Sequence, residues 1–330
     1  MNNYPINDSP LLIKKTIKDS GDEYLNNLLQ TYHRDGFIVF QPKDPNFIKG
    51  LDSIKEETYP YFSNDIKEIE KARKDNFEAP GVRLQDGWNK FNSIKNLACH
   101  PEILSLLKFL YGREAFPFQT LNFPHGTQQH FHSDAIHFSS IPNGFMCGVW
   151  VALEDIKEGS GLLEYFPGSH KFPYLHYSDV KDLPLTKEDG QEIFYDTWND
   201  LLEFYNIKKQ LFHAKKGDCL IWHANLIHGG SQVTDPTLTR WSQVSHYYFK
   251  DCLYYTPLLS YWPNGELFIR EPINILTSKK VEYDTLKLFF NLTGFNKERY
   301  LKINPDVEDA GMDALLHWLT FGLKENRKFK

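Results

Sequence analysis

MCGVWVALEDI, residues 146–156, is a short run rich in aromatic and β-branched residues. Such a composition favours a β-strand, because these side chains pack well on a pleated sheet. Four similar runs, bounded by Gly, Pro or Asn, are FPFQTLNF, SGLLEYFP, DCLIWHANLIH and RWSQVSHYYF. Between them, only residues 191–205 have a clear helical pattern. The runs therefore predict an antiparallel sandwich or barrel of the jelly-roll type.

Helices are expected on both sides of these strands. Residues 22–32 carry apolar residues at helical spacing before a glycine, and residues 55–74 and 94–111 are also compatible with helices. We expect two domains. Residues 1–275 would form the jelly roll with its N-terminal helices, and residues 280–330 a small helical C-terminal module.

The C-terminal module is predicted from its capping residues. Asn304 and Pro305 suit the N-cap and first position of a helix, Gly311 suits a helix end, and Asp313 suits the next cap. An apolar face follows in ALLHWL. We expect three short helices.

Composition excludes several classes of protein. The 330 residues, 41% of them hydrophobic, suffice for a sizeable core, and 37 basic against 43 acidic residues give a net charge of −6. No basic cluster suited to nucleic acid is visible. The sequence contains no apolar segment of membrane-spanning length and no secretory leader, so we expect a cytoplasmic location. The four cysteines form no CxxC pair.

The stretch QQHFHSDAIHF, residues 128–138, is rich in potential metal ligands. If residues 129–134 form a strand, His130, His132 and Asp134 share one face. An imidazole and a carboxylate on one face are two ligands that need a third. Two histidines and one carboxylate with open positions are typical of a non-haem Fe(II) oxygenase.

A third ligand should come from a distant strand. WHANLIHGGS offers His223 and His228, and His228 stands before two glycines, where a side chain can face a cavity mouth. An HxD pair alone is weak evidence in a chain with 13 histidines. Its weight comes from the motifs that follow in order: GSGLLEYFPGSH, KKGDCLIW, HGGS and then Arg240.

With these motifs in this order, residues 20–260 resemble the phytanoyl-CoA dioxygenase family of Fe(II)/2-oxoglutarate oxygenases. HSD followed by GVWVALEDI, then PGSH, KGD and HGGS with a later arginine, carry the resemblance. It implies a double-stranded β-helix, a cupin-like jelly roll flanked by helices. It also implies His132, Asp134 and His228 as the metal ligands and catalytic centre, Fe(II) as the cofactor, and 2-oxoglutarate and O2 as co-substrates.

The resemblance also implies a binding pocket for 2-oxoglutarate. Arg240 matches the position that binds the distal carboxylate, and its guanidinium suits bidentate binding of that group. Trp150 and Arg83 correspond to further residues of the pocket, although family members commonly carry lysine at the latter position. Ser231, in the HGGS turn, is another potential hydrogen-bond donor.

The activity implied is hydroxylation of a small molecule with release of succinate and CO2. Related halogenases replace the carboxylate ligand, so Asp134 favours hydroxylation. The stretch YLKINPDVEDAGMDALLHWLTFG resembles a helical module of bacterial surface-carbohydrate proteins. This points to a sugar, sugar nucleotide or polysaccharide-linked substrate. The module would otherwise pack against the barrel or mediate homodimer formation.

Two other functions fit parts of the pattern. A zinc ion with a bound water would make the triad a cupin-like hydrolase or isomerase, but this gives Arg240 no role. A non-catalytic glycan-binding jelly roll would need no intact triad.

Overall fold

Antiparallel strands dominate the larger of two units in the chain, Met1–Lys250 with Tyr254–Val281. The computed structural model describes residues 4–74, 82–180, 190–260, 267–283, 294–322, 325 and 327–328. The strands in the described part of the chain are β1 (Phe37–Phe40), β2 (Leu84–Gln85), β3 (Ala115–Phe123), β4 (Ser139–Ile141), β5 (Met146–Ala152), β6 (Leu163–Tyr165), β7 (Gln210–Phe212), β8 (Cys219–His223), β9 (His228–Gly230), β10 (Ser242–Phe249), β11 (Leu253–Tyr255), β12 (Ile273–Asn274) and β13 (Lys279–Lys280).

These strands form one large sheet and several small ones. The large sheet has six strands in the order β1-β8-β5-β10-β3-β2, and a second sheet has the order β7-β6-β9. Two-stranded sheets pair β11 with β4 and β12 with β13. The non-sequential order means that neighbours in the sheet come from distant parts of the chain. Residues 146–152 of the run MCGVWVALEDI form β5, in the middle of the large sheet.

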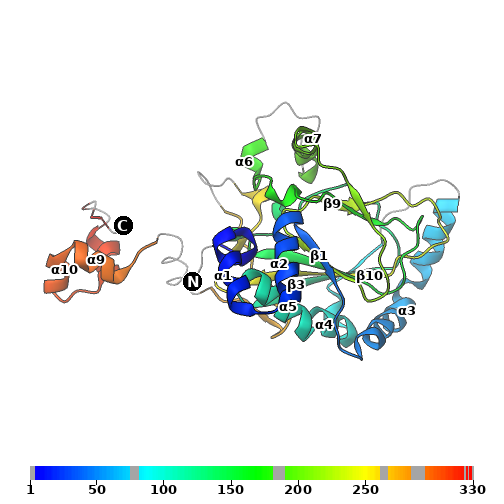
Figure 1. Ribbon diagram of the computed structural model, residues 1–330, viewed down its shortest axis with the longest axis horizontal. Coiled ribbons are helices and arrows are strands. Elements are labelled where there is room, and N and C mark those ends of the chain that lie inside the picture. Colours follow the sequence, from blue (N-terminus) through cyan, green and yellow to red (C-terminus); the bar gives the residue numbers. More distant parts are fainter. Residues whose placement is uncertain are drawn as a thin grey trace. The chain divides into compact units, whose positions relative to one another are not determined.

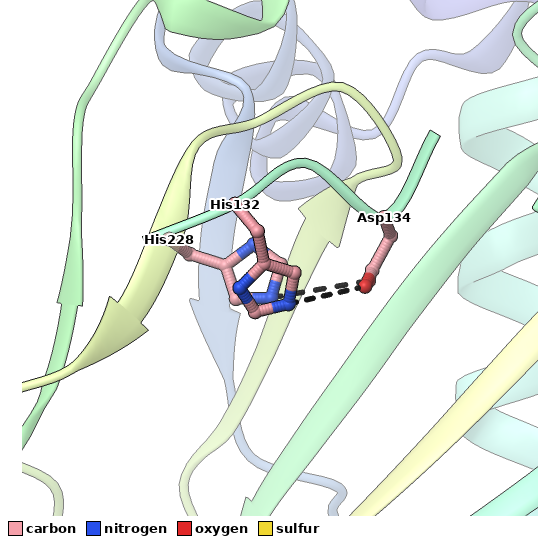
Figure 2. A group of neighbouring side chains, drawn as sticks. All are labelled: His132, Asp134 and His228. Atoms are coloured by element: carbon pink, nitrogen blue, oxygen red, sulfur yellow. Dashed lines mark ion pairs between the residues drawn. The ribbon is translucent and has the colours of Figure 1, made fainter. Parts of the chain in front are cut away.

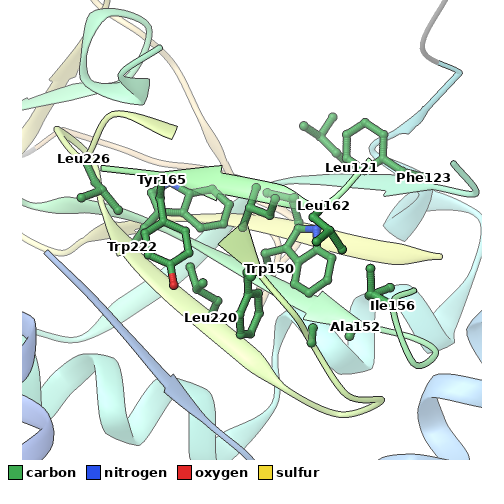
Figure 3. Close-up of a cluster of buried hydrophobic side chains, with 14 residues drawn as sticks. Leu121, Phe123, Trp150, Ala152, Ile156, Leu162, Tyr165, Leu220, Trp222 and Leu226 are labelled. Atoms are coloured by element: carbon green, nitrogen blue, oxygen red, sulfur yellow. The ribbon is translucent and has the colours of Figure 1, made fainter. Parts of the chain in front are cut away.

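One hydrophobic core lies between the six-stranded and three-stranded sheets (Figure 3). Trp150 and Trp222 come from the large sheet, and Tyr165 and Phe212 from the small one. The rings of Trp150 and Phe212 meet edge to face with centroids 5.8 Å apart. Truncating a buried ring of this size costs about 3–5 kcal/mol. Two sheets facing across one core confirm the predicted double-stranded β-helix.

Helices cover the other face of the six-stranded sheet (Figure 1). Side chains of β10 alternate between the two faces, so that Val244 enters the core while the hydroxyl of Tyr247 donates to the carbonyl of Ala98 in a helix. The helices of this unit are α1 (Pro10–Ser20), α2 (Glu23–Asp35), α3 (Phe47–Lys74), α4 (Asn92–Ala98), α5 (Pro101–Tyr111), α6 (Tyr177–Val180) and α7 (Tyr195–Phe204).

Local sequence sets the ends of α2. The carboxylate of Asp22 accepts a hydrogen bond from the backbone N–H of Leu25, which caps the helix. Gly36 ends it with φ of 82°. A side chain at Gly36 would also clash, because an added Cβ would lie 2.4 Å from Nδ1 of His170. The predicted helix at residues 22–32 and its glycine stop are confirmed.

His170 links the turn after β6 to the end of α2. It lies in a short 3-10 helix, Ser169–Lys171, and its Nε2–H donates to the carbonyl of His33 over 3.1 Å. Burial lowers the pKa of His170 to about 3, and the neighbouring His223 adds to this effect. The imidazole is therefore neutral in the folded protein at neutral pH.

This lowered pKa predicts a pH dependence of stability. Between about pH 6.5 and 3 the unfolded chain binds a proton at His170 that the folded chain does not, so stability falls as the pH falls through this range. We expect the free energy of unfolding to depend less steeply on pH in His170→Asn than in the wild-type protein, by up to about 1.4 kcal/mol per pH unit. Urea unfolding from pH 7 to 4.5 measures this, with the exposed His213→Asn as control. Equal slopes for wild type and His170→Asn would contradict it.

The second unit, Asp251–Leu253 with Glu282–Lys330, is mostly helical. It contains α9 (Lys297–Ile303), α10 (Pro305–Asp309) and α11 (Ala314–His317), followed by a π-helical turn, Trp318–Gly322. Its core gathers Phe295, Tyr300, Val307, Ala314, Leu315 and Trp318. The described residues of this unit thus include helices on both sides of Asn304, as its capping pattern predicts. Within the described part of the chain, no helix has both the length and the hydrophobicity of a membrane span.

Candidate active site

Three buried side chains from two distant segments converge in the larger unit: His132, Asp134 and His228 (Figure 2). One ligand atom of each lies within 4.8 Å of the other two. Nε2 of His132 is 3.6 Å from Oδ1 of Asp134, and Nε2 of His228 is 3.9 Å from Oδ2. Of the two histidines offered by WHANLIHGGS, His228 joins this group. His223 lies instead 3.3 Å from Oδ1 of Asp8.

The backbone brings the two histidines together. The N–H of His132 donates to the carbonyl of His228 over 2.8 Å, and the N–H of His228 donates back over 3.0 Å. The prediction of a strand at residues 129–134 is wrong, because this bridge is isolated and a 3-10 helix, Asp134–Ile136, follows at once. The hydroxyl of Ser133 accepts from the N–H of Ala135 and thereby caps that turn. The turn still directs Asp134 towards both histidines.

Hydrogen bonds fix the tautomer of each histidine. Nδ1 of His132 is 3.0 Å from the carbonyl of His130, and Nδ1 of His228 is 3.0 Å from the carbonyl of Leu226. Because a carbonyl only accepts, each Nδ1 carries the proton and each Nε2 keeps a lone pair. Burial lowers the pKa of His228 to about 4. The ring of His228 therefore offers a neutral ligand nitrogen, as metal binding requires.

Asp134 is held by two residues that the sequence interpretation missed. The indole N–H of Trp222 donates to its Oδ2 over 2.7 Å, and Nε2 of His246 lies 3.4 Å from the same oxygen. Burial alone would raise the pKa of Asp134, but His246 and His228 together hold it well below the ordinary value. Trp222 packs closely against Gly148, where an added Cβ would lie 2.3 Å from the indole.

The contact from Trp222 predicts an effect on metal affinity. Loss of an outer hydrogen bond to a metal ligand typically weakens binding about 10–100-fold. We expect Trp222→Phe to raise the dissociation constant for Fe(II) by this factor. Equilibrium titration without O2 measures it, and Trp198→Phe is the control, since Trp198 is equally buried in a separate cluster. An unchanged dissociation constant for Trp222→Phe would contradict the role.

A cavity of about 320 Å³ opens onto the triad. Its described lining residues are Arg83, Gln85, Gln119, Leu121, Phe123, Thr127, Gln129, His132, Asp134, His137, Phe138, Trp150, Leu163, Gln191, Trp222, His228, Gly229, Arg240, Val244 and His246. This volume suits a small molecule.

The residues predicted for the co-substrate pocket fall into two groups. Arg240, Trp150 and Arg83 all line this cavity. Arg240 is only 3% exposed, and its Nη1 donates to the carbonyl of Gly161 over 2.9 Å. Trp150 is also part of the core, and Arg83 is exposed. Ser231 is partly buried, is not among the described lining residues, and donates its backbone N–H to Leu162.

The other histidines of the stretch QQHFHSDAIHF lie outside the triad. His130 is exposed and stacks on Tyr195 with ring centroids 4.0 Å apart, so it does not share a surface with His132 and Asp134. His137 lines the cavity, and its Nε2 is 2.9 Å from Oε1 of Gln191. The position of His137 thus follows from the turn at Asp134, not from a strand.

Comparison with known proteins identifies relatives over most of the larger unit. A family model described as phytanoyl-CoA dioxygenase (PhyH) matches residues 32–238. Peroxisomal phytanoyl-CoA dioxygenase from Homo sapiens is 24% identical over 219 residues, which cover 61% of this chain and 62% of the relative. Phytanoyl-CoA dioxygenase domain-containing protein 1 from Danio rerio is 32% identical over 109 residues, covering 31% and 33%. The chain thus spans less than two thirds of the length of these curated relatives.

Two solved structures show a more distant similarity to this chain. One is the non-heme alpha ketoglutarate dependent epimerase SnoN from nogalamycin biosynthesis, with 18% identity, a TM-score of 0.48 and coverage of 79% of this chain and 96% of that chain. The other is EctD from S. alaskensis with 2-oxoglutarate and 5-hydroxyectoine, with 18% identity, a TM-score of 0.49 and coverage of 66% and 74%.

Proposed function

The chain belongs to the phytanoyl-CoA dioxygenase family, and from this premise we propose that it is an Fe(II)- and 2-oxoglutarate-dependent oxygenase. The observation that carries the proposal is the buried group His132, Asp134 and His228, in which the Nε2 atom of each histidine faces the carboxylate and keeps a lone pair for a metal ion. Two histidines and one carboxylate leave coordination positions for further ligands, as non-haem Fe(II) oxygenases require.

Bound Fe(II) supplies the O2 chemistry, in which 2-oxoglutarate becomes succinate and CO2 and the substrate gains a hydroxyl group. His132, Asp134 and His228 hold the metal. Trp222 holds the carboxylate of Asp134 in place. Because related halogenases replace this carboxylate, its presence favours hydroxylation over halogenation. The burial of these side chains keeps bulk water from the reacting groups.

Arg240 binds the distal carboxylate of 2-oxoglutarate in this proposal. A buried guanidinium suits this role, because its fork gives two parallel, charge-assisted hydrogen bonds to a carboxylate. Trp150 forms an apolar wall beside the co-substrate, and Arg83 provides a second cation in the same cavity. Ser231 stays a predicted hydrogen-bond donor, at the turn after β9.

For the substrate we propose a small carbohydrate-type molecule: a sugar, sugar nucleotide or polysaccharide-linked metabolite. The sequence of the C-terminal module supports this choice. The zinc hydrolase or isomerase is not favoured, since it gives the buried Arg240 no role, and the intact triad disfavours a non-catalytic jelly roll. A cytoplasmic location and a homodimer stay predictions.

Turnover of 2-oxoglutarate tests the activity. Protein purified without air is supplied with Fe(II), 2-oxoglutarate and O2, and succinate is quantified with and without candidate substrates. Succinate that appears only when all three components are present supports the oxygenase. If the purified protein contains only zinc and forms no succinate, the proposed oxygenase activity is contradicted.

A further inference from the structure

Side-chain amides are prominent in the wall of the cavity, beside the residues already assigned to the metal and 2-oxoglutarate. Gln119 comes from β3, Gln129 from the loop before His132, and Gln191 from a 3-10 helix, Gly190–Phe194. Gln85 of β2 adds a fourth amide. Four separate segments thus bring the same neutral, hydrogen-bonding group to one cavity.

Two of these amides are held in place by histidines of the site. Oε1 of Gln119 is 2.8 Å from Nδ1 of His246, the residue beside Asp134. Oε1 of Gln191 is 2.9 Å from Nε2 of His137, and its amide N–H donates to the hydroxyl of Tyr195 over 2.9 Å. These contacts orient the amides and use only part of their hydrogen-bonding capacity, since each amide has two N–H donors and two lone pairs.

The third amide lies directly beside the metal ligands. Nε2 of Gln129 is 3.4 Å from Nε2 of His132. Because Gln119 reaches His246, which in turn faces Asp134, the amides lie one or two side chains from the metal position. A substrate whose reacting carbon approaches the metal must therefore contact this part of the wall.

The energetics of these contacts distinguish two classes of substrate. An acyl chain would take the amides out of water without giving them partners, at a cost of about 1–3 kcal/mol for each unsatisfied group. A hydroxyl group both donates and accepts, so a polyhydroxylated molecule satisfies an amide in either orientation. Phe138, which lines the same cavity, offers an apolar surface to the C–H face of a sugar ring.

We propose that Gln119, Gln129 and Gln191 select a polyhydroxylated small molecule, such as a sugar unit, and disfavour an acyl chain. The inference rests on the proposed oxygenase function and names the residues that set its specificity. The proposed substrate class therefore differs from the acyl-CoA that the names of the curated relatives indicate.

Near-isosteric substitutions test the inference. Gln119→Met and Gln191→Met keep the side-chain volume and remove the amide, and Gln210→Met is the matched control, on an exposed position of β7 outside the cavity. The probes are methyl α-glucoside, glucose 1-phosphate, UDP-glucose and palmitoyl-CoA. Calorimetry on the metal-free protein gives dissociation constants, and mass spectrometry after turnover with Fe(II), 2-oxoglutarate and O2 detects added oxygen.

We expect at least one sugar probe to bind and gain oxygen, and palmitoyl-CoA to do neither. Each cavity substitution should weaken sugar binding about 10-fold, the effect of roughly one lost hydrogen bond, while Gln210→Met leaves it unchanged. Oxygenation of palmitoyl-CoA alone, no binding of any sugar probe, or equal binding by the cavity variants and the control would overturn the inference. Sugar binding that depends on the glutamine amides but is not accompanied by succinate formation would support the proposed selectivity and would contradict the oxygenase activity.

Discussion

Asp134→Ala is expected to abolish succinate formation. The substitution removes one of three metal ligands, and it removes the only carboxylate among the described residues of that group. Loss of a hydrogen bond behind a ligand already weakens binding about 10–100-fold, so loss of the ligand itself should cost more. Succinate release and Fe(II) binding, measured on the same preparation, give the two readouts.

The variant should remain folded. The reciprocal backbone hydrogen bonds between His132 and His228 do not involve the Asp134 side chain. The main loss of folding stability comes from the indole N–H of Trp222, which loses its hydrogen-bond acceptor. A buried donor left without an acceptor costs about 1–3 kcal/mol. Asp155→Ala, which removes an exposed carboxylate, is the control and should keep full activity. Normal succinate formation by folded Asp134→Ala would refute its assignment as a ligand.

Arg240→Leu is expected to raise the KM for 2-oxoglutarate at least about 30-fold. Truncating one partner of a buried, hydrogen-bonded charge pair costs about 2–5 kcal/mol, and 1.4 kcal/mol is a factor of ten. Arg240 is almost fully buried in the cavity wall, so water would not replace the lost charge. Arg240→Lys should have an intermediate KM, because it keeps the charge and loses the planar fork.

Steady-state kinetics with varied 2-oxoglutarate measure this effect. Arg34→Leu is the control, since Arg34 is exposed and pairs with Asp35 at the surface. A KM for Arg240→Leu within about twofold of the wild-type value would show that the distal carboxylate is bound elsewhere. Arg83 would then be the next candidate, because it lines the same cavity.

Much of the secondary structure could be predicted from the residue types in short runs of the sequence. Runs such as MCGVWVALEDI and RWSQVSHYYF contain the aromatic and β-branched residues that strands need, and they form β5 and β10. The glycine and capping residues likewise located α2, α10 and α11. The order of strands in the sheets could not be read from these runs, because pairing depends on long-range packing.

The candidate site was only partly predictable. His132, Asp134 and His228 were found through motif order, although the strand expected at residues 129–134 is a bridge and a turn. Trp222 and His246 lay within strands already predicted, at alternating positions that share a face with Leu220 and Val244. Alternation alone does not say which face meets the metal, so their contact with Asp134 needed the fold.

The amide wall could not be anticipated from local sequence. Gln119, Gln129 and Gln191 are ordinary polar residues of a strand, a loop and a short helix. No local spacing relates them, since their common surroundings arise only when the sheets fold around the cavity. Sites built from many segments are in general the part of a protein that motif analysis describes least well.

Anomalous diffraction from crystals grown with Fe(II) in the absence of O2 tests the central claim most directly. One iron atom per chain should be bound by Nε2 of His132, a carboxylate oxygen of Asp134 and Nε2 of His228, with neighbouring positions open to 2-oxoglutarate. Iron bound by other residues, or no iron between these three side chains, would contradict the account.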